Sequence, residues 1–377
     1  MELQFKDHKF RIMAVGDPHE KFADTTEKDA AKIEDYMRLQ YTAIEELKPD
    51  LVVLMGDNAS GGSPDELRGV LTRITGPYAL RNIPFAFILG NHDLESGVSD
   101  MDTQYDIYRS LPGCMLPGKD EVNDFGDYNL TVKNTDGTKD ALNLWFMYSG
   151  NRAEPKYNST YDFVKTEQIN WYENKAAELK EKNGGIVPAV LFQHIPVPEE
   201  FALLKKRSIF SLLADGTEGQ NNRRGSYYTL DRKAGTTGYM GEAPCSPDYN
   251  NGQFASWKKT GDVFAAFFGH DHMNDFVGMT DGIVLGQCKT ASFRVYGDGM
   301  MQGVRVIDLN DRVPDNFETR MAYYRELVGP TCRSLSGRER DMRDRTSVKL
   351  ETAGKVLPVF AALSAPLILK KLIKRKK

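Results

Sequence analysis

The amino-acid sequence predicts an α/β protein built as one large domain. Short apolar segments rich in β-branched and aromatic residues recur along the chain, each bounded by Gly, Pro or Asp, and helical patterns separate the early segments. Strands that alternate with helices are typical of an α/β architecture. A chain of 377 residues with 40% hydrophobic composition is long enough to bury a sizeable core.

Seven apolar segments are predicted strands, and two helices are expected between them. The strands are expected at residues 12–15, 51–55, 85–89, 142–148, 187–192, 263–268 and 283–285. One helix is expected to begin after Ser63, because Pro64 suits the first helical position and Glu66 completes a capping box. The second is expected at residues 166–182, which are rich in Glu, Lys, Ala and Leu.

Residues 201–256 interrupt this alternation with scattered Gly, Asn, Ser, Tyr and Pro. A long irregular segment inside a compact domain is usually functional or disordered, so we interpret it as a loop-rich insertion near a site. The large domain is expected to cover residues 1–340. Residues 341–377 form a C-terminal tail with an apolar stretch and a basic end.

Five polar clusters each follow a predicted strand. They are Gly16-Asp17-Pro18-His19, Gly56-Asp57-Asn58, Gly90-Asn91-His92-Asp93, Gln193-His194 and Gly269-His270-Asp271-His272. Five of the six histidines of the chain lie in these clusters. Ligands of open α/β sheets bind beyond the carboxyl ends of the strands, so the clusters are expected to converge on one rim.

Residue types of this kind indicate a binuclear metal site. Two cations about 3.5 to 4 Å apart repel each other, and a shared carboxylate is the simplest bridge that holds them together. Neutral imidazoles and an amide complete the coordination without negative charge that would repel a phosphate. Mixed nitrogen and oxygen ligands suit Mn, Fe, Zn, Co or Ni better than Ca or Mg.

The ordered set of motifs resembles the calcineurin-like metallophosphoesterase family over roughly residues 9–310. Near residues 193–196 and 269–275 the sequence is similar to the branch related to purple acid phosphatases. The resemblance implies two packed mixed β-sheets flanked by helices. It also implies hydrolysis of a phosphate ester, most readily a small phosphomonoester, by a hydroxide held between two divalent or trivalent metal ions such as Mn, Fe or Zn.

The resemblance assigns a role to each matching residue. The first metal is expected to bind Asp17, His19 and His272. The second is expected to bind Asn91, His194 and His270. Asp57 is expected to bridge the two ions, and His92, oriented by Asp93, to clamp the phosphate and protonate the leaving oxygen.

One position departs from purple acid phosphatases, which carry a metal-binding Tyr three residues after the bridging Asp. Ser60 occupies that position here. The resemblance therefore predicts a colourless enzyme whose metal need not be Fe(III). Two alternatives stay open: a phosphodiesterase acting on nucleotides or glycerophosphodiesters, and a non-catalytic membrane-associated scaffold on the same fold.

The charge distribution bears on partners and location. The formal net charge is −4, but six basic residues lie in the last eight positions, so residues 1–369 carry 43 basic against 53 acidic residues, a net charge of −10. Such a body disfavours long nucleic acid as a partner and leaves a small phosphorylated substrate. Contact with a substrate phosphate is one interpretation of Arg223, Arg224 and Arg294, but solvated surface charge is the preferred interpretation of each. The four cysteines form no CxxC pair and are expected to be buried or incidental thiols.

The N-terminus has no apolar signal segment, which favours a cytoplasmic protein. Residues 356–369 carry no charge and precede the basic end. A helix of this length reaches about 21 Å, less than the roughly 30 Å of a bilayer core. We therefore expect a peripheral anchor on an anionic cytoplasmic membrane surface, with a disordered or core-docked tail as the alternative.

Overall fold

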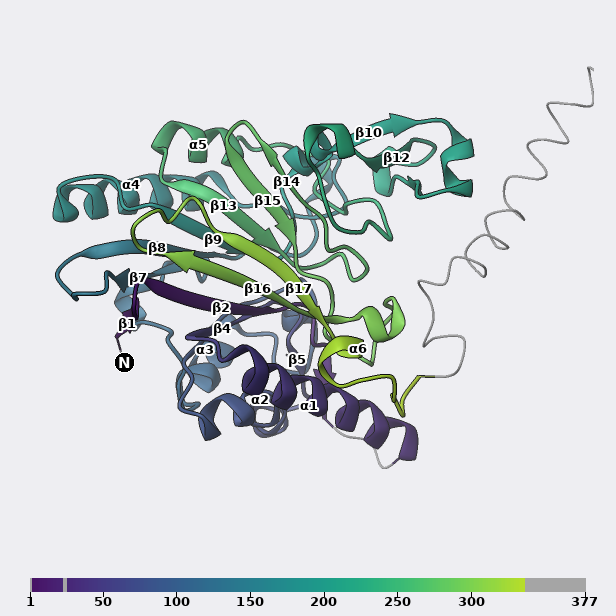
Figure 1. The fold of residues 1–377 in the computed structure, drawn as a ribbon, viewed down its shortest axis with the longest axis horizontal. Helices are drawn as coiled ribbons and strands as arrows, with labels where there is room; N and C mark the ends of the chain where they lie inside the picture. Colours follow the sequence, from purple (N-terminus) through teal and green to yellow (C-terminus); the bar gives the residue numbers. More distant parts are fainter. Residues whose placement is uncertain (1, 23–25, 336–377) are drawn as a thin grey trace, which may run out of the picture.

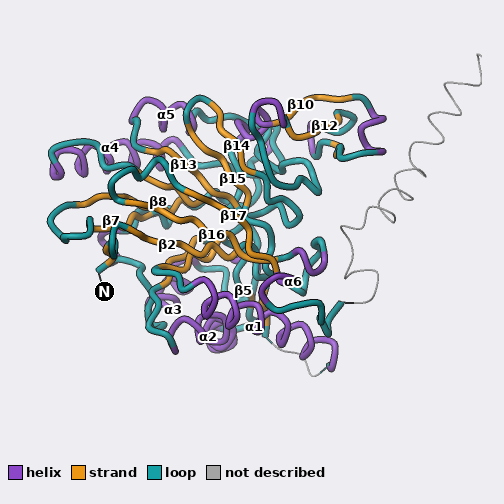
Figure 2. Tube along the Cα trace, viewed as in Figure 1, coloured by secondary structure: helices purple, strands orange, loops and turns teal. Residues whose placement is uncertain are grey.

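The computed structural model of the protein describes residues 2–22 and 26–335. The tail predicted at residues 341–377 lies outside the described residues. Two large mixed sheets form the centre of the molecule (Figures 1 and 2). Two smaller sheets lie beside them, one of two strands and one of three.

The strands of the seven-stranded sheet follow one another across it as β1 (Leu3–Gln4), β7 (Tyr128–Lys133), β8 (Asp140–Met147), β9 (Ala189–Gln193), β13 (Val263–Phe268), β15 (Ile283–Gln287) and β14 (Val277–Thr280). Strands β8, β9, β13 and β15 run parallel, and the pairings of β7 with β8 and of β14 with β15 are antiparallel.

The strands of the five-stranded sheet follow one another as β17 (Glu318–Tyr323), β16 (Gly303–Asn310), β2 (Lys9–Val15), β4 (Leu51–Met55) and β6 (Phe85–Ile88). Strands β2, β4 and β6 run parallel, and β16 pairs antiparallel with both β2 and β17. All seven strands predicted from the sequence are present within the two large sheets.

Helices cover the outer faces of both sheets. Their bounds are α1 (Glu27–Leu47), α2 (Pro64–Leu80), α3 (Met101–Arg109), α4 (Thr166–Asn183), α5 (Gln253–Thr260) and α6 (Tyr324–Leu327). In Figure 1, α1, α2 and α3 lie beside the five-stranded sheet, and α4 and α5 lie on the far side of the seven-stranded sheet. The predicted pair of packed mixed sheets flanked by helices is therefore confirmed.

Side-chain alternation in the seven-stranded sheet explains its uniformly apolar strands. In β8, Leu144 and Phe146 belong to the core between the two sheets, whereas Trp145 and Met147 belong to the core under α4 and α5. Successive side chains of a strand point to opposite faces, so a strand that is buried on both faces reads as a continuous apolar run. These runs are the signal that made the strands recognisable in the sequence.

The start of α2 follows the expected N-cap chemistry in part. The Ser63 hydroxyl accepts a hydrogen bond from the main-chain N–H of Glu66 at 3.3 Å, and Pro64 is the first helical residue. The Glu66 carboxylate, however, accepts from Gly62 N–H at 2.8 Å rather than from the N-cap residue. The predicted capping box is thus present in a shifted form, in which Glu66 bonds the residue before the N-cap.

Residues 201–256 contain a small antiparallel sheet of β10 (Leu204–Arg207), β12 (Tyr227–Leu230) and β11 (Thr217–Glu218), joined by loops and 3₁₀ turns. Figure 1 shows β10 and β12 projecting from one corner of the body. The strands are two to four residues long, too short for an alternating pattern to be visible in the sequence. Among the helices that the structure describes, none is long and apolar enough to span a membrane.

Candidate metal centre

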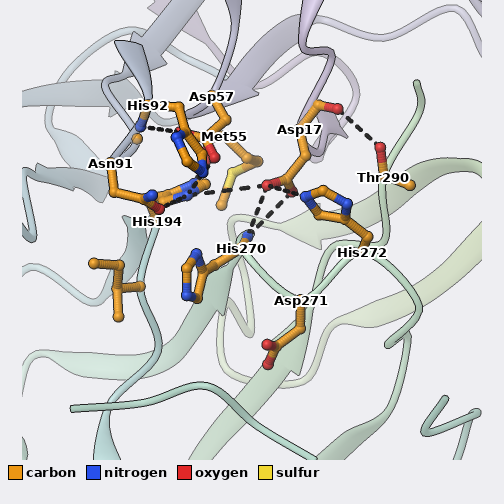
Figure 3. A network of polar contacts seen from close by, with 12 residues as sticks. Asp17, Met55, Asp57, Asn91, His92, His194, His270, Asp271, His272 and Thr290 are labelled. Carbon is orange, nitrogen blue, oxygen red and sulfur yellow. Dashed lines mark hydrogen bonds and ion pairs between the residues drawn. The ribbon is translucent and has the colours of Figure 1, made fainter. Parts of the chain in front are cut away.

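The polar clusters occupy the carboxyl ends of strands from both large sheets. Strands β2, β4 and β6 of the five-stranded sheet lead into the clusters of Asp17, Asp57 and Asn91, whereas β9 and β13 lead into His194 and His270. Figure 3 shows Asp17, Asp57, Asn91, His194 and His272 close together, with the His270 ring beside that of His194 and with Asp271 directed away from the cluster. The structure thus brings together side chains that the sequence separates by more than 250 residues.

The backbone at this rim turns sharply. Four of the expected ligands have positive φ angles: Asp17 (43°), His19 (45°), Asp57 (50°) and His270 (72°). Non-glycine residues rarely adopt this region, and such conformations cluster at functional sites. Gly90 is also required here, because a Cβ atom at this position would lie 2.2 Å from Asp57 Oδ1.

One group of three side chains could hold a metal ion: Asp17, His19 and His272. The Nε2 atoms of His19 and His272 lie 3.2 Å apart, and His272 Nε2 lies 3.7 Å from Asp17 Oδ1. Burial lowers the pKa of His19 to about 4 and that of His272 to about 3. Both rings are therefore neutral near pH 7, and their free lone pairs are available to a cation.

A second group of three, Asp17, Asp57 and His194, lies beside the first. Asp57 Oδ2 is 3.4 Å from His19 Nε2 and 3.3 Å from His194 Nε2, so its carboxylate faces both groups. His194 Nε2 also lies 3.1 Å from Asn91 Oδ1. This placement suits the bridging role that the resemblance implied for Asp57.

The donor set fits a pair of cations. His270 Nε2 is buried and has no hydrogen-bond partner among the described residues, which is costly for a ring nitrogen unless a ligand completes it. Burial lowers the pKa of His270 well below its usual range, so this ring is neutral. Buried, uncharged and unpartnered, this nitrogen is well suited to be a metal ligand.

Asp57 and His194 each shift the pKa of the other. Burial by itself would raise the pKa of Asp57, but the imidazoles of His194 and His19 outweigh it and hold that pKa well below its usual range. Burial alone would lower the pKa of His194, but the Asp57 carboxylate raises it. The raised pKa means that His194 holds its second proton more tightly. A cation that binds His194 must displace that proton, because a ligating imidazole is neutral.

Main-chain carbonyls fix which nitrogen of two rings faces the centre. His194 Nδ1 donates to the carbonyl of Met55 at 2.9 Å, and His272 Nδ1 donates to that of Tyr296 at 3.1 Å. Each contact leaves Nε2 free to act as a ligand. The hydroxyl of Thr290 donates to the carbonyl of Asp17 at 2.8 Å and braces the first cluster.

His92 lies at the edge of the centre, with its side chain 52% exposed. Its main-chain N–H donates to Asp57 Oδ1 at 2.7 Å. Its ring Nδ1 contacts Glu95 Oε2 at 2.5 Å. Hydrogen bonds from Asn151 and His92 lower the pKa of Glu95, so its carboxylate is ionised at neutral pH.

The predicted contact between Asp93 and His92 is wrong. The buried Asp93 carboxylate accepts the main-chain N–H groups of Asn58 at 2.8 Å, Ala59 at 3.1 Å and Gly90 at 2.7 Å. Asp93 therefore holds the loops after β4 and β6 together and does not orient the ring. Glu95 contacts the ring instead, because side chains three residues apart lie on one side of a 3₁₀ turn.

The three arginines considered from the sequence have different environments. Arg294 is nearly buried and pairs with Glu20 and Asp29, and Arg223 pairs with Asp248. Arg224 is exposed. The interpretation of Arg294 as a solvated surface charge is therefore wrong, because its buried side chain holds the strand that follows the Asp17 cluster. All four cysteines, which lie within the described residues, are free thiols.

A cavity of about 490 Å³ opens onto the centre. It is lined by residues that include His19, Asp57, Ser60, His92, Glu95 and Val295. Ser60 therefore faces the cavity at the position where purple acid phosphatases carry a metal-binding Tyr. A volume of this size accommodates a small molecule.

Residues 10–274 match the model of the calcineurin-like phosphoesterase family, and the chain belongs to this family. Its relatives include two from Arabidopsis thaliana. Probable inactive purple acid phosphatase 14 is 31% identical, over 81% of this chain and 77% of the relative. Probable inactive purple acid phosphatase 29 is 27% identical, over 81% of this chain and 78% of the relative. A solved dimetal phosphatase from Danio rerio superposes with a TM-score of 0.47 at 11% identity, over 84% of this chain and 99% of that one.

Proposed function

We propose that this protein hydrolyses a phosphate ester, most readily a small phosphomonoester, with two metal ions bound at the candidate centre. The observation that carries the proposal is the pair of overlapping groups, Asp17, His19 and His272 and Asp17, Asp57 and His194, that could each hold a metal ion, with the buried, unpartnered His270 Nε2 nearby. The cavity beside them supports a small substrate. Mn, Fe and Zn suit the mixture of imidazole, carboxylate and amide ligands.

The chain's own residues divide the work of this reaction. Asp17, His19 and His272 would hold one ion, Asn91, His194 and His270 the other, and Asp57 would bridge them. When bound, the ions supply an activated water and neutralise charge on the phosphoryl oxygens. His92, which lines the cavity, donates a proton from its ring to the leaving oxygen as the bond from phosphorus to that oxygen breaks.

The names of the two plant relatives favour a second candidate function, in which the fold serves as a non-catalytic scaffold. This chain supports the catalytic proposal more strongly, because every expected ligand position and His92 are filled. A scaffold has no need of a buried, unpartnered imidazole nitrogen, which destabilises the fold when no ligand completes it.

The experiment that tests the proposal is reconstitution of the metal-stripped protein with Mn, Fe, Zn or Mg. Turnover of p-nitrophenyl phosphate and bis(p-nitrophenyl) phosphate is then compared with that of the His92→Ala variant. Restored turnover, faster on the monoester and diminished in the variant because His92 also clamps the phosphate, is the expected result. Faster turnover of the diester would favour a phosphodiesterase acting on nucleotides or glycerophosphodiesters. Failure of every metal to support turnover, despite binding, would favour the scaffold.

Two further proposals concern the surroundings of the protein. We propose a cytoplasmic location, and contact of the C-terminal tail with an anionic membrane surface. The acidic charge of residues 1–369 supports a small phosphorylated substrate over long nucleic acid. Binding of the full-length chain to anionic and neutral lipid vesicles, compared with a chain truncated after residue 340, tests the role of the tail.

A further inference from the structure

The ring of His92 is held at one point besides its own backbone. It is more than half exposed, and within residues 2–22 and 26–335 the one hydrogen bond of its ring runs from Nδ1 to Glu95 Oε2 at 2.5 Å. The nearest aromatic contact, with His19, separates the ring centroids by 5.7 Å. An exposed side chain held this loosely samples several rotamers unless a partner fixes it.

Glu95 is itself fixed from the opposite sheet. Its second oxygen, Oε1, accepts a hydrogen bond from Asn151 Nδ2 at 2.9 Å. Asn151 lies in the loop after β8 of the seven-stranded sheet, whereas His92 and Glu95 follow β6 of the five-stranded sheet. Each oxygen of the carboxylate therefore has a separate partner, and the three residues form a chain across the mouth of the centre.

We propose that Glu95 is a positioning residue that aims His92 at the substrate, and that Asn151 sets the orientation of Glu95. A carboxylate that accepts the proton of Nδ1 leaves Nε2 as the ring nitrogen that faces the cavity. The doubly protonated ring then donates its Nε2 proton to the leaving oxygen and becomes the neutral ring that keeps its Nδ1 proton, and Glu95 remains ionised throughout. This inference rests on the proposed function and deepens it by adding two residues to the reaction.

The role of Glu95 predicts a specific kinetic signature. An alkoxide leaves poorly and depends on proton donation, whereas p-nitrophenolate leaves readily without it. Loss of Glu95 should therefore slow hydrolysis of an alkyl ester far more than that of an aryl ester. A merely structural defect would slow both equally.

The test compares the metal-loaded full-length protein with Glu95→Ala, Glu95→Gln and Asn151→Ala variants, on p-nitrophenyl phosphate and glycerol 2-phosphate. We expect Glu95→Ala to lower kcat for the alkyl ester about tenfold and that for the aryl ester less than threefold, with KM unchanged. Asn151→Ala should show a smaller loss with the same selectivity. Glu154→Ala removes an exposed carboxylate of the neighbouring loop, paired with Lys156, and serves as the control.

Two further measurements separate positioning from general damage. In a His92→Ala background, Glu95→Ala should cause no additional loss, because both act through one proton transfer. ¹⁵N spectra of histidine-labelled protein, assigned with the His92→Ala variant, should show a protonated Nδ1 of His92 that changes in Glu95→Ala. The spectra report on the contact without turnover.

The outcomes are distinguishable. Equal losses on both esters, additive losses in the double variant, or an unchanged His92 signal would each overturn the positioning role while leaving the proposed hydrolysis intact. If the wild-type protein turned over none of p-nitrophenyl phosphate, bis(p-nitrophenyl) phosphate and glycerol 2-phosphate, the proposed function would be overturned, and the positioning role with it.

Discussion

The two large sheets contribute different chemistry to the candidate centre. The five-stranded sheet supplies both carboxylates, Asp17 and Asp57, and the amide of Asn91, along with His19. The seven-stranded sheet supplies imidazoles alone. These are His194, His270 and His272.

This difference places the negative charge on one side of the centre and neutral donors on the other. Contacts between the sheets keep the two sides in register, including His194 Nδ1 to the Met55 carbonyl and the main-chain N–H of His270 to Asp17 Oδ1 at 3.0 Å. A cation bound between them would tie one sheet to the other. The comparison predicts that removing charge from one side and removing a donor from the other have different consequences.

The largest effect is expected from Asp57→Asn, which removes the bridging charge. Two adjacent cations without a shared carboxylate repel each other, so the pair of ions should be lost or misplaced. The ions lower the activation free energy by several kcal/mol, and turnover should therefore fall by about 10³-fold or more. The matched control is Asp281→Asn, an exposed residue whose φ of 49° is close to the 50° of Asp57. Equal activity of the two variants would refute the bridging role.

A smaller loss is expected from His270→Ala, which removes one neutral donor from the imidazole side. The variant should lose the more weakly held ion on dialysis, because one ligand is missing. Its turnover should fall about 10²-fold, since the bridging carboxylate remains. Metal content by elemental analysis is the measurement. His8→Ala is the control, because His8 also has a positive φ, 63°, and lies outside the centre. Full retention of two ions by His270→Ala would contradict the assignment.

Asp93→Asn tests the side of the centre that belongs to the five-stranded sheet without touching a ligand. An amide has one accepting oxygen, so its NH₂ group would face a main-chain N–H donor that now bonds to a carboxylate oxygen. The free energy of unfolding should therefore fall by roughly 3 kcal/mol. Urea unfolding measures this change, with the exposed Asp124→Asn as control. By contrast, Glu95→Ala should leave stability within about 0.5 kcal/mol of the wild type.

The smallest effect is expected from Glu200, buried beside the seven-stranded sheet, where Gln287 Nε2 donates to it at 2.7 Å. Burial raises the pKa of Glu200 to about 8. Between about pH 5 and pH 8 the unfolded chain has lost this proton and the folded chain retains it, so stability falls as pH rises. Glu200→Gln should flatten this fall, because an amide does not titrate in the window. An unchanged pH profile in urea unfolding would show that Glu200 is ionised in the folded state.

The sequence predicted the strands that lead into the centre because each is buried on both faces and ends in a polar cluster. Strand β16 was not predicted, although it lies between β2 and β17. Its apolar run is interrupted by Arg305 and Asp308, and Arg305 is buried because it donates to the carbonyls of Gln287 and Asp275. Such long-range hydrogen bonds leave no local pattern in the sequence.

The expected ligands were accessible to sequence reasoning because strand ends of parallel sheets meet at one edge. The partner of His92 was not, because adjacency in sequence favoured Asp93. In the 3₁₀ turn that follows His92, the neighbouring carboxylate turns inward to main-chain donors and Glu95 returns to the side of the ring. The role of Asn151 depends on the packing of two sheets, which no local pattern encodes.

The most direct test of the central claim is a crystal structure of the Mn-loaded protein with anomalous scattering recorded for the metal. Two anomalous peaks are predicted, one among Asp17, His19 and His272 and the other among Asn91, His194 and His270, with the Asp57 carboxylate in contact with both. A single peak, or two peaks away from these side chains, would contradict the account.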